Sequence, residues 1–279
     1  MKPLMSTMLQ RLSVADHDEL IRWAAPVPCF GDLTSSGVAT VGINPSNREF
    51  VDTDGLELSG LQRRFHTLSS LGIECWDDAQ EEAIDGILEL CSEYFFRNPY
   101  GAWFNRLTPI ISAAGASYYD RLFPACHLDL LPFATDAKWG SLPPARRREI
   151  LDSNADLLVD LIATSDLELL ILNGQSVVSE FMLMTGLQLA AQEMPGWDLP
   201  RASGQPVAGI GYKGTCEALN GKALAKPLTV LGFNHNIQSS FGVTSEVIQN
   251  ISKWVERESR TFEFKNSTKN KTLSAARRI

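Results

Sequence analysis

Four short apolar runs are the main pattern along the chain. They lie at residues 38–43, 125–133, 167–172 and 227–233. Apolar runs without polar alternation are typical of strands that are buried on both faces, as in a parallel sheet. We therefore predict four buried strands at these positions.

Segments with helical spacing separate the four runs. Apolar residues of 107–111 share one helix stripe, and a capping serine with two early prolines begins a single helix over 141–162. A last helix follows Thr244 or Ser245. Strands that alternate with helices predict an α/β fold, a three-layer α/β/α domain with a central, mainly parallel sheet of about four strands.

Length and hydropathy narrow the class of protein. The 279 residues, 44% of them hydrophobic, are enough for one large α/β domain, which we place at residues 1–256. No stretch reaches about 18 apolar residues, so no membrane span is expected. The first residues contain no apolar segment of the secretory type, and we expect a cytoplasmic protein.

Cysteine and histidine spacing argues against a metal centre. The number of cysteines is odd and no CxxC pair occurs, which disfavours a disulfide framework, a zinc site or an iron–sulfur cluster. The four histidines lack metal-ligand spacing. We therefore expect reduced, buried thiols, no metal and no cofactor. The cysteines are Cys29, Cys75, Cys91, Cys126 and Cys216. The segment GIGYKG at 209–214 is expected to be a hairpin or loop and not a nucleotide-binding fingerprint.

Charge is distributed unevenly. The net charge of the chain is −8, but residues 253–279 hold eight Lys and Arg against three Glu. We predict that 257–279 form a basic, flexible tail, which either is attracted to phosphate or only solubilises the terminus.

Polar residues follow each predicted strand. In parallel sheets ligands bind beyond the carboxyl ends of the strands, so Asn44, Asp129, Asn173 and His235 are expected at one cleft. Turn formation alone explains the Asn-Pro and Asn-Gly pairs. Asp129 interrupts an apolar sequence, where a charge is costly unless it is paired or faces the cleft. Two structural alternatives stay open, a loop-capping Asp129 and a core His235.

The same polar segments carry a family resemblance. Residues 41–47, VGINPSN, resemble the first motif of the uracil-DNA glycosylase superfamily, and most closely its mismatch-specific uracil/thymine branch. Residues 235–240, HNIQSS, are similar to its second motif, with Asn236 and Gln238 in place of two prolines. Residues 129–132 resemble the base-reading stretch of the single-strand-selective branch, and 95–107 the aromatic segment of the mismatch branch. The pieces occur in family order.

The resemblance implies a DNA glycosylase that hydrolyses the N-glycosidic bond of a flipped pyrimidine and leaves an abasic site. By the resemblance, Asn44 holds the attacking water and His235 donates to the pyrimidine O2. Ile43 and Ser46 line the base pocket. DNA is then the partner of a monomeric enzyme, and Asn236, Ile237, Gln238, Ser239 and Ser240 contact it.

Two departures from the family pattern bear on the substrate. Ser46 replaces a tyrosine that blocks C5 substituents in the uracil-specific branch, so the C5 side should be open. Asp129 replaces a base-reading asparagine, and a carboxylate only accepts hydrogen bonds, which suits the 4-amino group of cytosine. Together they predict a 5-substituted cytosine, such as the glucosylated hydroxymethylcytosine of phage genomes, and a role in anti-phage defence.

An insertion at about 49–92 separates the first motif from the aromatic segment. Phe50 and Phe96 are alternative candidates to stack on the base, and each could instead be a core aromatic. Arg63, Arg64 and residues 146–148 could contact DNA, although 146–148 fit a solvated helix surface better.

Three other functions stay open. They are uracil or thymine mismatch repair, processing of free nucleosides by an α/β enzyme, and an inactive member that binds DNA.

Overall fold

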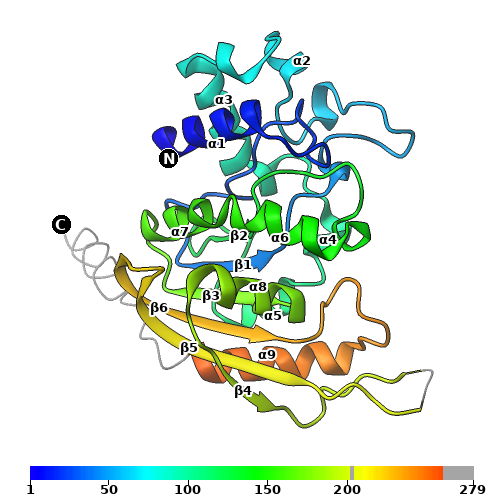
Figure 1. The fold of residues 1–279 in the computed structure, drawn as a ribbon. Helices are drawn as coiled ribbons and strands as arrows, with labels where there is room; N and C mark the ends of the chain where they lie inside the picture. Colours follow the sequence, from blue (N-terminus) through cyan, green and yellow to red (C-terminus); the bar gives the residue numbers. More distant parts are fainter. Residues whose placement is uncertain (202–203, 260–279) are drawn as a thin grey trace, which may run out of the picture.

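The computed structural model describes residues 1–201 and 204–259, and within them a single twisted sheet of six strands forms the centre (Figure 1). The strand order is β2-β1-β3-β6-β5-β4. Helices cover both faces, so the predicted three-layer α/β/α class is confirmed. The strands are β1 Val38–Gly42, β2 Ala125–Asp129, β3 Leu169–Asn173, β4 Ala190–Glu193, β5 Ile210–Leu219 and β6 Lys222–Phe233.

The four predicted strands form the parallel half of this sheet. β1 pairs in parallel with β2 and β3, and β3 pairs in parallel with β6. Every residue of β1, β2 and β3 is buried, as is the second half of β6, which explains the lack of polar alternation. The second run ends early as a strand, because the chain leaves the sheet after Asp129.

Two antiparallel strands extend the sheet beyond the prediction of about four. β5 and β6 form a long hairpin whose turn is Asn220-Gly221, both with positive φ, the conformation that favours Asn-Gly turns. The segment 209–214, expected as a hairpin or loop, forms the start of β5. β4 pairs along the outer side of β5 and is short and exposed, as edge strands often are.

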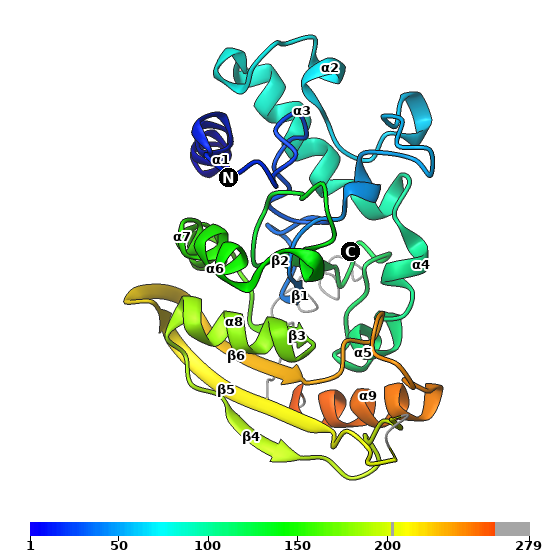
Figure 2. The ribbon, with the colours of Figure 1, turned by 45° about the vertical axis from the view of Figure 1, so that its right-hand side comes forward.

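The helices form two layers around the sheet. α6, α7 and α8 lie on one face, and α4, α5 and α9 lie on the other (Figure 2). α1 and α3 pack against each other beyond the β2 edge. The helices are α1 Lys2–Val14, α2 Leu68–Leu71, α3 Glu81–Ser92, α4 Gly101–Phe104, α5 Thr108–Ala113, α6 Pro144–Asp152, α7 Ala155–Ala163, α8 Gln175–Thr185 and α9 Ser245–Ser259, with short 3-10 turns at Asn47–Glu49, Gly60–Gln62, Trp76–Asp78, Tyr94–Phe96 and Trp139–Ser141.

The prediction of one helix over 141–162 is wrong in one respect. The segment forms two helices, α6 and α7, which are separated at Ser153 and Asn154. The Ser153 hydroxyl donates to the Glu149 carbonyl, and the buried Asn154 amide donates to the Ile150 carbonyl. These side chains compete with the backbone for the helical acceptors, which ends the first helix.

The segment 49–92 contributes to the same core as the sheet. Phe50, Phe65 and Trp76 are each buried within the hydrophobic core cluster that also contains the strands. The N-terminal helix α1 joins this cluster through Met5 and Met8. The segment therefore packs as an integral part of the molecule.

Membrane spans, cysteines and the C-terminal segment were the other subjects of prediction. The described part of the chain contains no helix that is long and apolar enough to cross a membrane. All five cysteines are free; Cys29, Cys91 and Cys126 are buried, whereas Cys75 is exposed, contrary to the expectation of uniformly buried thiols. The first three residues of the predicted tail, 257–259, lie within α9, contrary to the expectation of a flexible segment, and 260–279 lie outside the described residues.

Candidate active site

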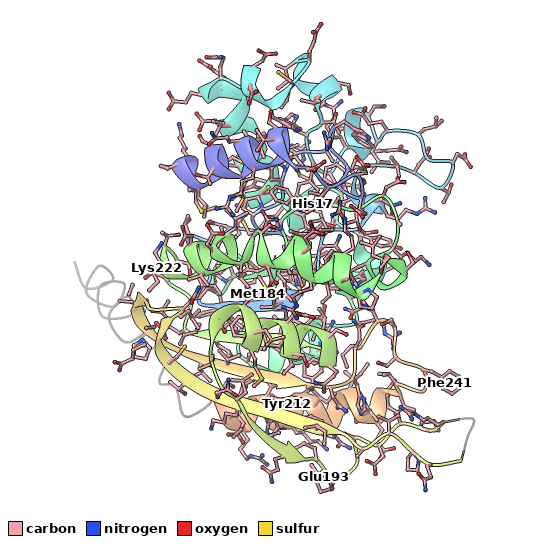
Figure 3. All side chains as sticks on the ribbon, viewed as in Figure 1. His17, Met184, Glu193, Tyr212, Lys222 and Phe241 are labelled. Atoms are coloured by element: carbon pink, nitrogen blue, oxygen red, sulfur yellow. The ribbon has the colours of Figure 1, made fainter. Side chains whose placement is uncertain are left out.

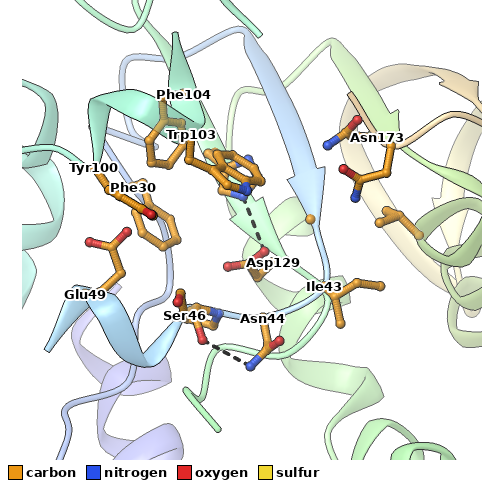
Figure 4. Close-up of a pocket in the computed structure, with 15 residues that line it drawn as sticks. Phe30, Ile43, Asn44, Ser46, Glu49, Tyr100, Trp103, Phe104, Asp129 and Asn173 are labelled. Atoms are coloured by element: carbon orange, nitrogen blue, oxygen red, sulfur yellow. Dashed lines mark hydrogen bonds and ion pairs between the residues drawn. The ribbon is translucent and has the colours of Figure 1, made fainter. Parts of the chain in front are cut away.

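A cavity of about 170 Å³ lies at the carboxyl ends of β1, β2 and β3, where the fold class predicts a ligand site. Its size is below the roughly 300–1,000 Å³ of pockets for drug-sized ligands and fits a single heterocyclic base. Figure 4 shows the side chains that line the cavity. Its lining comprises Phe30, Gly42, Ile43, Asn44, Pro45, Ser46, Glu49, Tyr100, Trp103, Phe104, His127, Asp129, Asn173, Val177 and Asn236.

Asn44 is held by its amide nitrogen. The Nδ2 atom donates to the Pro45 carbonyl at 3.1 Å, to Thr135 Oγ1 at 3.1 Å and to the Phe133 carbonyl at 3.4 Å. These contacts fix the orientation of the side chain, and the amide oxygen keeps its acceptor capacity. Asn44 can therefore present a fixed hydrogen-bond acceptor to a ligand in the cavity.

Asp129 enters the cavity from the last position of β2. Its side chain is 3% exposed, and Oδ1 lies 3.3 Å from Nε2 of His127, which points to the same side of the strand two residues earlier. The other ring nitrogen of His127 lies 2.7 Å from Thr40 Oγ1. The His127 ring therefore fixes the carboxylate of Asp129 from one side.

Gly42 makes the close packing of these groups possible. It lies opposite Asp129 in the register of β1 and β2. A Cβ atom at this position would lie 2.4 Å from Asp129 Oδ1 and 3.0 Å from His127 Nε2. The carboxylate of Asp129 can therefore occupy its position in the cavity only because residue 42 has no side chain.

Aromatic rings form one wall of the cavity. Phe30, Tyr100, Trp103 and Phe104 lie together on that side in Figure 4. Phe30 is fixed against His127 by two backbone hydrogen bonds of 2.8 and 2.9 Å. Flat rings of this kind provide the faces on which a base can stack.

Neither aromatic residue predicted to stack on the base lines the cavity. Phe50 is 1% exposed and packs against Trp23 and Phe65 in the core. Phe96 is exposed and lies under the guanidinium group of Arg121. Phe50 therefore follows the core-aromatic alternative, because the chain turns into the core directly after the first motif, whereas Phe96 is neither a stacking nor a core residue.

Glu49 is a lining residue that the sequence did not indicate. It is 3% exposed, and the Tyr94 hydroxyl donates to both carboxylate oxygens at 2.9 and 3.0 Å. Burial raises the pKa of Glu49 to about 7; Arg64 and the Tyr94 hydroxyl act against this rise, and the charge of Asp129 adds to it. The cavity thus contains Glu49 as a carboxyl group in addition to Asp129, and burial brings the pKa of Glu49 to about 7.

His235 does not line the cavity, contrary to the expectation from the second motif. Its side chain is 2% exposed, and Nε2 donates to the carbonyl of Trp197 at 2.7 Å. Burial lowers the pKa of His235, which favours the neutral ring. The contact ties the end of β6 to the segment between β4 and β5, as in the core-histidine alternative.

The loop after His235 is only partly available to DNA. Ile237 is fully buried, so it cannot contact DNA as the resemblance implied. Gln238 points inward, because its Oε1 accepts a hydrogen bond from Asn173 Nδ2 at 2.6 Å and its Nε2 donates to the Trp103 carbonyl at 3.2 Å. Asn236 lines the cavity, Ser240 is half-buried and Ser239 is exposed.

Phe241 is the most exposed aromatic side chain of the described residues. It is 79% exposed and follows this loop directly. In Figure 3 it projects outward from the connection between β6 and α9. The sequence comparison overlooked it, because it lies one position beyond the second motif.

Three of the five arginines proposed to contact DNA, namely Arg64, Arg146 and Arg148, are engaged within the protein. Arg64 lies 3.7 Å from Glu49 and donates to the carbonyls of Arg48 and Asn98. Arg146 pairs with Glu19 and Glu149, and Arg148 pairs with Asp152 and Glu180. These contacts agree with the alternative of a solvated helix surface for 146–148.

Comparison with known proteins gives no independent assignment. Neither a protein-family model nor a curated protein sequence matches the chain. Among the described residues, no three His, Cys, Asp or Glu side chains are grouped so that they could hold a metal ion.

Five of the residues expected at the site thus share one cavity, namely Ile43, Asn44, Ser46, Asp129 and Asn173, together with Asn236 from the DNA-binding set. The sequence reasoning missed Glu49 and His127. His127 could have been predicted, because it lies two residues before Asp129 on the same strand, and residues two apart on a strand face the same side.

Proposed function

We propose that the protein is a DNA glycosylase that hydrolyses the N-glycosidic bond of a flipped, 5-substituted cytosine and leaves an abasic site. The observation that carries the proposal is the meeting of Asn44 and Asp129 in one aromatic-walled cavity at the carboxyl ends of β1 and β2. An anti-phage defence role on modified phage DNA, including glucosylated hydroxymethylcytosine, follows from this substrate.

Asn44 positions the nucleophile in this proposal. Its amide oxygen accepts a hydrogen bond from a water molecule, and its amide nitrogen is already held by Pro45, Phe133 and Thr135. An amide cannot ionise at ordinary pH, so Asn44 orients the water more than it removes its proton. The water attacks C1′ of a sugar that carries positive charge in the transition state while the bond from C1′ to N1 of the base breaks. The base leaves as an anion and takes up the proton that the water loses.

Asn236 takes the role that the resemblance gave to His235. The departing base becomes anionic and needs a donor at O2. Asn236 lines the cavity, and its Oδ1 accepts from the backbone N–H groups of Gln238 and Ser239 at 3.0 Å each. With the oxygen engaged, Nδ2 is the group that donates to the base. Gly174 permits this position, because a Cβ there would lie 3.0 Å from Cβ of Asn236.

Asp129 and Ser46 select the base. The Asp129 carboxylate accepts from the 4-amino group of cytosine, whereas O4 of uracil would face it with like charge. Ser46 is small and exposed at the rim, so a substituent on C5 can extend past it to solvent.

Phe241 is proposed to fill the gap that the flipped nucleotide leaves. Wedge residues that enter a base stack are apolar and exposed in the free protein. Phe241 meets both conditions, and it lies five residues after Asn236 of the cavity.

The test is a panel of DNA duplexes, each with one cytosine, uracil, thymine mismatch, 5-methylcytosine or 5-hydroxymethylcytosine. Abasic sites are scored by alkaline cleavage under single-turnover conditions. We expect the wild type to prefer 5-substituted cytosine over uracil, and Asp129→Asn to shift the preference toward uracil by about 5- to 150-fold.

The same panel separates the alternatives. Efficient release of uracil with no release from any modified cytosine would favour mismatch repair instead. Release of bases only from free nucleosides, and never from DNA, would favour nucleoside processing. A protein that binds these duplexes and releases no base would be an inactive member.

A further inference from the structure

Glu49 is a buried carboxyl group in the cavity that the proposed reaction does not use. It belongs to the turn Asn47–Glu49, directly after the segment that carries Asn44 and Ser46. Figure 4 shows it beside Phe30 and Tyr100, on the side of the cavity away from Asn173. Burial of a carboxyl group costs free energy unless the group has hydrogen-bond partners, so the partners of Glu49 matter.

The carboxyl group is held in place and only partly satisfied. Tyr94 donates one hydroxyl proton to it, and Arg64 Nε lies 3.7 Å away. Tyr94 is itself fixed, because its oxygen accepts from the Tyr100 N–H at 2.8 Å and its ring stacks on Phe65. Two carboxylate oxygens offer about four acceptor sites, so capacity remains for a donor in the cavity.

Glu49 adjoins the two residues that select the base in the proposed function, Ser46 and Asp129. Its backbone N–H donates to the Ser46 carbonyl at 3.0 Å, so the two residues lie within one turn. Asp129, which would read the 4-amino group, is close enough to raise the pKa of Glu49. C4 and C5 are adjacent ring atoms, and the groups that face them must also be neighbours.

Resting on the proposed function, we propose that Glu49 accepts a hydrogen bond from a hydroxyl group of the C5 substituent. The substrate class is then a cytosine whose 5-substituent carries a hydroxyl, either directly or on an attached sugar. A neutral hydroxyl fits better than an ammonium group, because the Arg64 guanidinium lies next to the same carboxylate. A plain methyl group cannot donate, so it would leave the remaining acceptor capacity of Glu49 unused.

The test compares single-turnover release of 5-hydroxymethylcytosine, 5-methoxymethylcytosine, 5-aminomethylcytosine, 5-methylcytosine and uracil from otherwise identical duplexes. We expect the wild type to release 5-hydroxymethylcytosine about 10- to 100-fold faster than 5-methylcytosine, the worth of one hydrogen bond to a charged group. The methoxymethyl base, which cannot donate, should behave like the methyl base.

Variants assign the preference to the residue. Glu49→Leu should bring the ratio of hydroxymethyl to methyl release close to one, and Glu49→Gln, which keeps an acceptor, should give an intermediate ratio. The exposed Glu74→Gln is the control and should leave the ratio unchanged. If the Glu49 variants do not fold, the methoxymethyl comparison in the wild type still decides whether a donor on the substituent is read.

The outcomes distinguish the two proposals. Release of no modified cytosine at all would overturn the proposed function, and this inference with it. Equal release of hydroxymethyl and methoxymethyl bases, or an unchanged ratio in Glu49→Leu, would overturn the inference and leave the glycosylase intact. Fastest release of the aminomethyl base would replace the hydroxyl class with a cationic one.

Discussion

Gly42→Ala is the sharpest test of the cavity geometry, because it adds one methyl group to a known position. The new Cβ would lie 2.4 Å from Asp129 Oδ1, and ordinary contact begins at 3.4 Å. The carboxylate must therefore move by about 1 Å, and His127 Nε2, at 3.0 Å from the same Cβ, blocks part of the space. A misplacement of about 1 Å can cost on the order of 100-fold in rate.

We expect release of 5-substituted cytosine to slow by about 10- to 100-fold in Gly42→Ala. Overpacking at a buried strand should also lower the free energy of unfolding by about 1–3 kcal/mol. Single-turnover cleavage measures the first effect and chemical denaturation the second. Gly140→Ala is the matched control, because a Cβ there meets nothing within 4 Å.

A double-mutant cycle shows whether the loss acts through Asp129. In the Asp129→Ala background no carboxylate remains to be displaced, so Gly42→Ala should cost far less than it does in the wild type. A folded Gly42→Ala protein with wild-type rates would refute the placement of Asp129 at the base. Equal losses in both backgrounds would show that the backbone of β1, and not the carboxylate, is disturbed.

Three further predictions follow from the site. Asn44→Ala should remove most single-turnover activity with little change in melting temperature. His235→Ala should mainly lower the unfolding free energy, by about 1–3 kcal/mol, because it loses a buried hydrogen bond to the Trp197 carbonyl. The reverse pattern would show that His235 takes part in the reaction. Phe241→Ala should slow release from duplex DNA about 10-fold or more and from single strands much less, with the exposed Leu122→Ala as control; equal slowing on both would argue against a wedge. For Glu49 the folded pKa of about 7 lies above the ordinary value of 4.5, so its contribution to stability is fully present below pH 4.5 and is lost as the pH rises through 7. As the pH rises from 5 to 8, the unfolding free energy of Glu49→Gln should therefore increase relative to that of the wild type, by up to about 3 kcal/mol. Chemical denaturation measures this difference, and a difference that does not change with pH would contradict the prediction.

The apolar runs were enough to predict the parallel half of the sheet. β1, β2, β3 and β6 are buried on both faces, and burial on both faces removes polar alternation from the sequence itself. The antiparallel strands β4 and β5 were missed, because their exposed and half-buried residues carry no such signal. The Asn220-Gly221 turn was a local signal for the β5–β6 hairpin that the sequence reasoning did not use.

Part of the candidate site was also predictable from the chain. Asn44 and Asp129 directly follow or end buried strands, and parallel strands bring their carboxyl ends to one edge whatever the details of packing. The sequence by itself therefore determined the fold class and the meeting of these two side chains.

Only the tertiary structure decided which neighbouring side chains face the cavity. His235 and Asn236 are adjacent, yet one turns to the Trp197 carbonyl and the other lines the pocket. Glu49 and Phe50 are adjacent as well, and it is the carboxyl group that enters the cavity while the ring packs in the core. A turn or loop has no fixed side-chain period, so the direction of each residue depends on contacts with Tyr94, Trp103 or Trp197, which are distant in sequence.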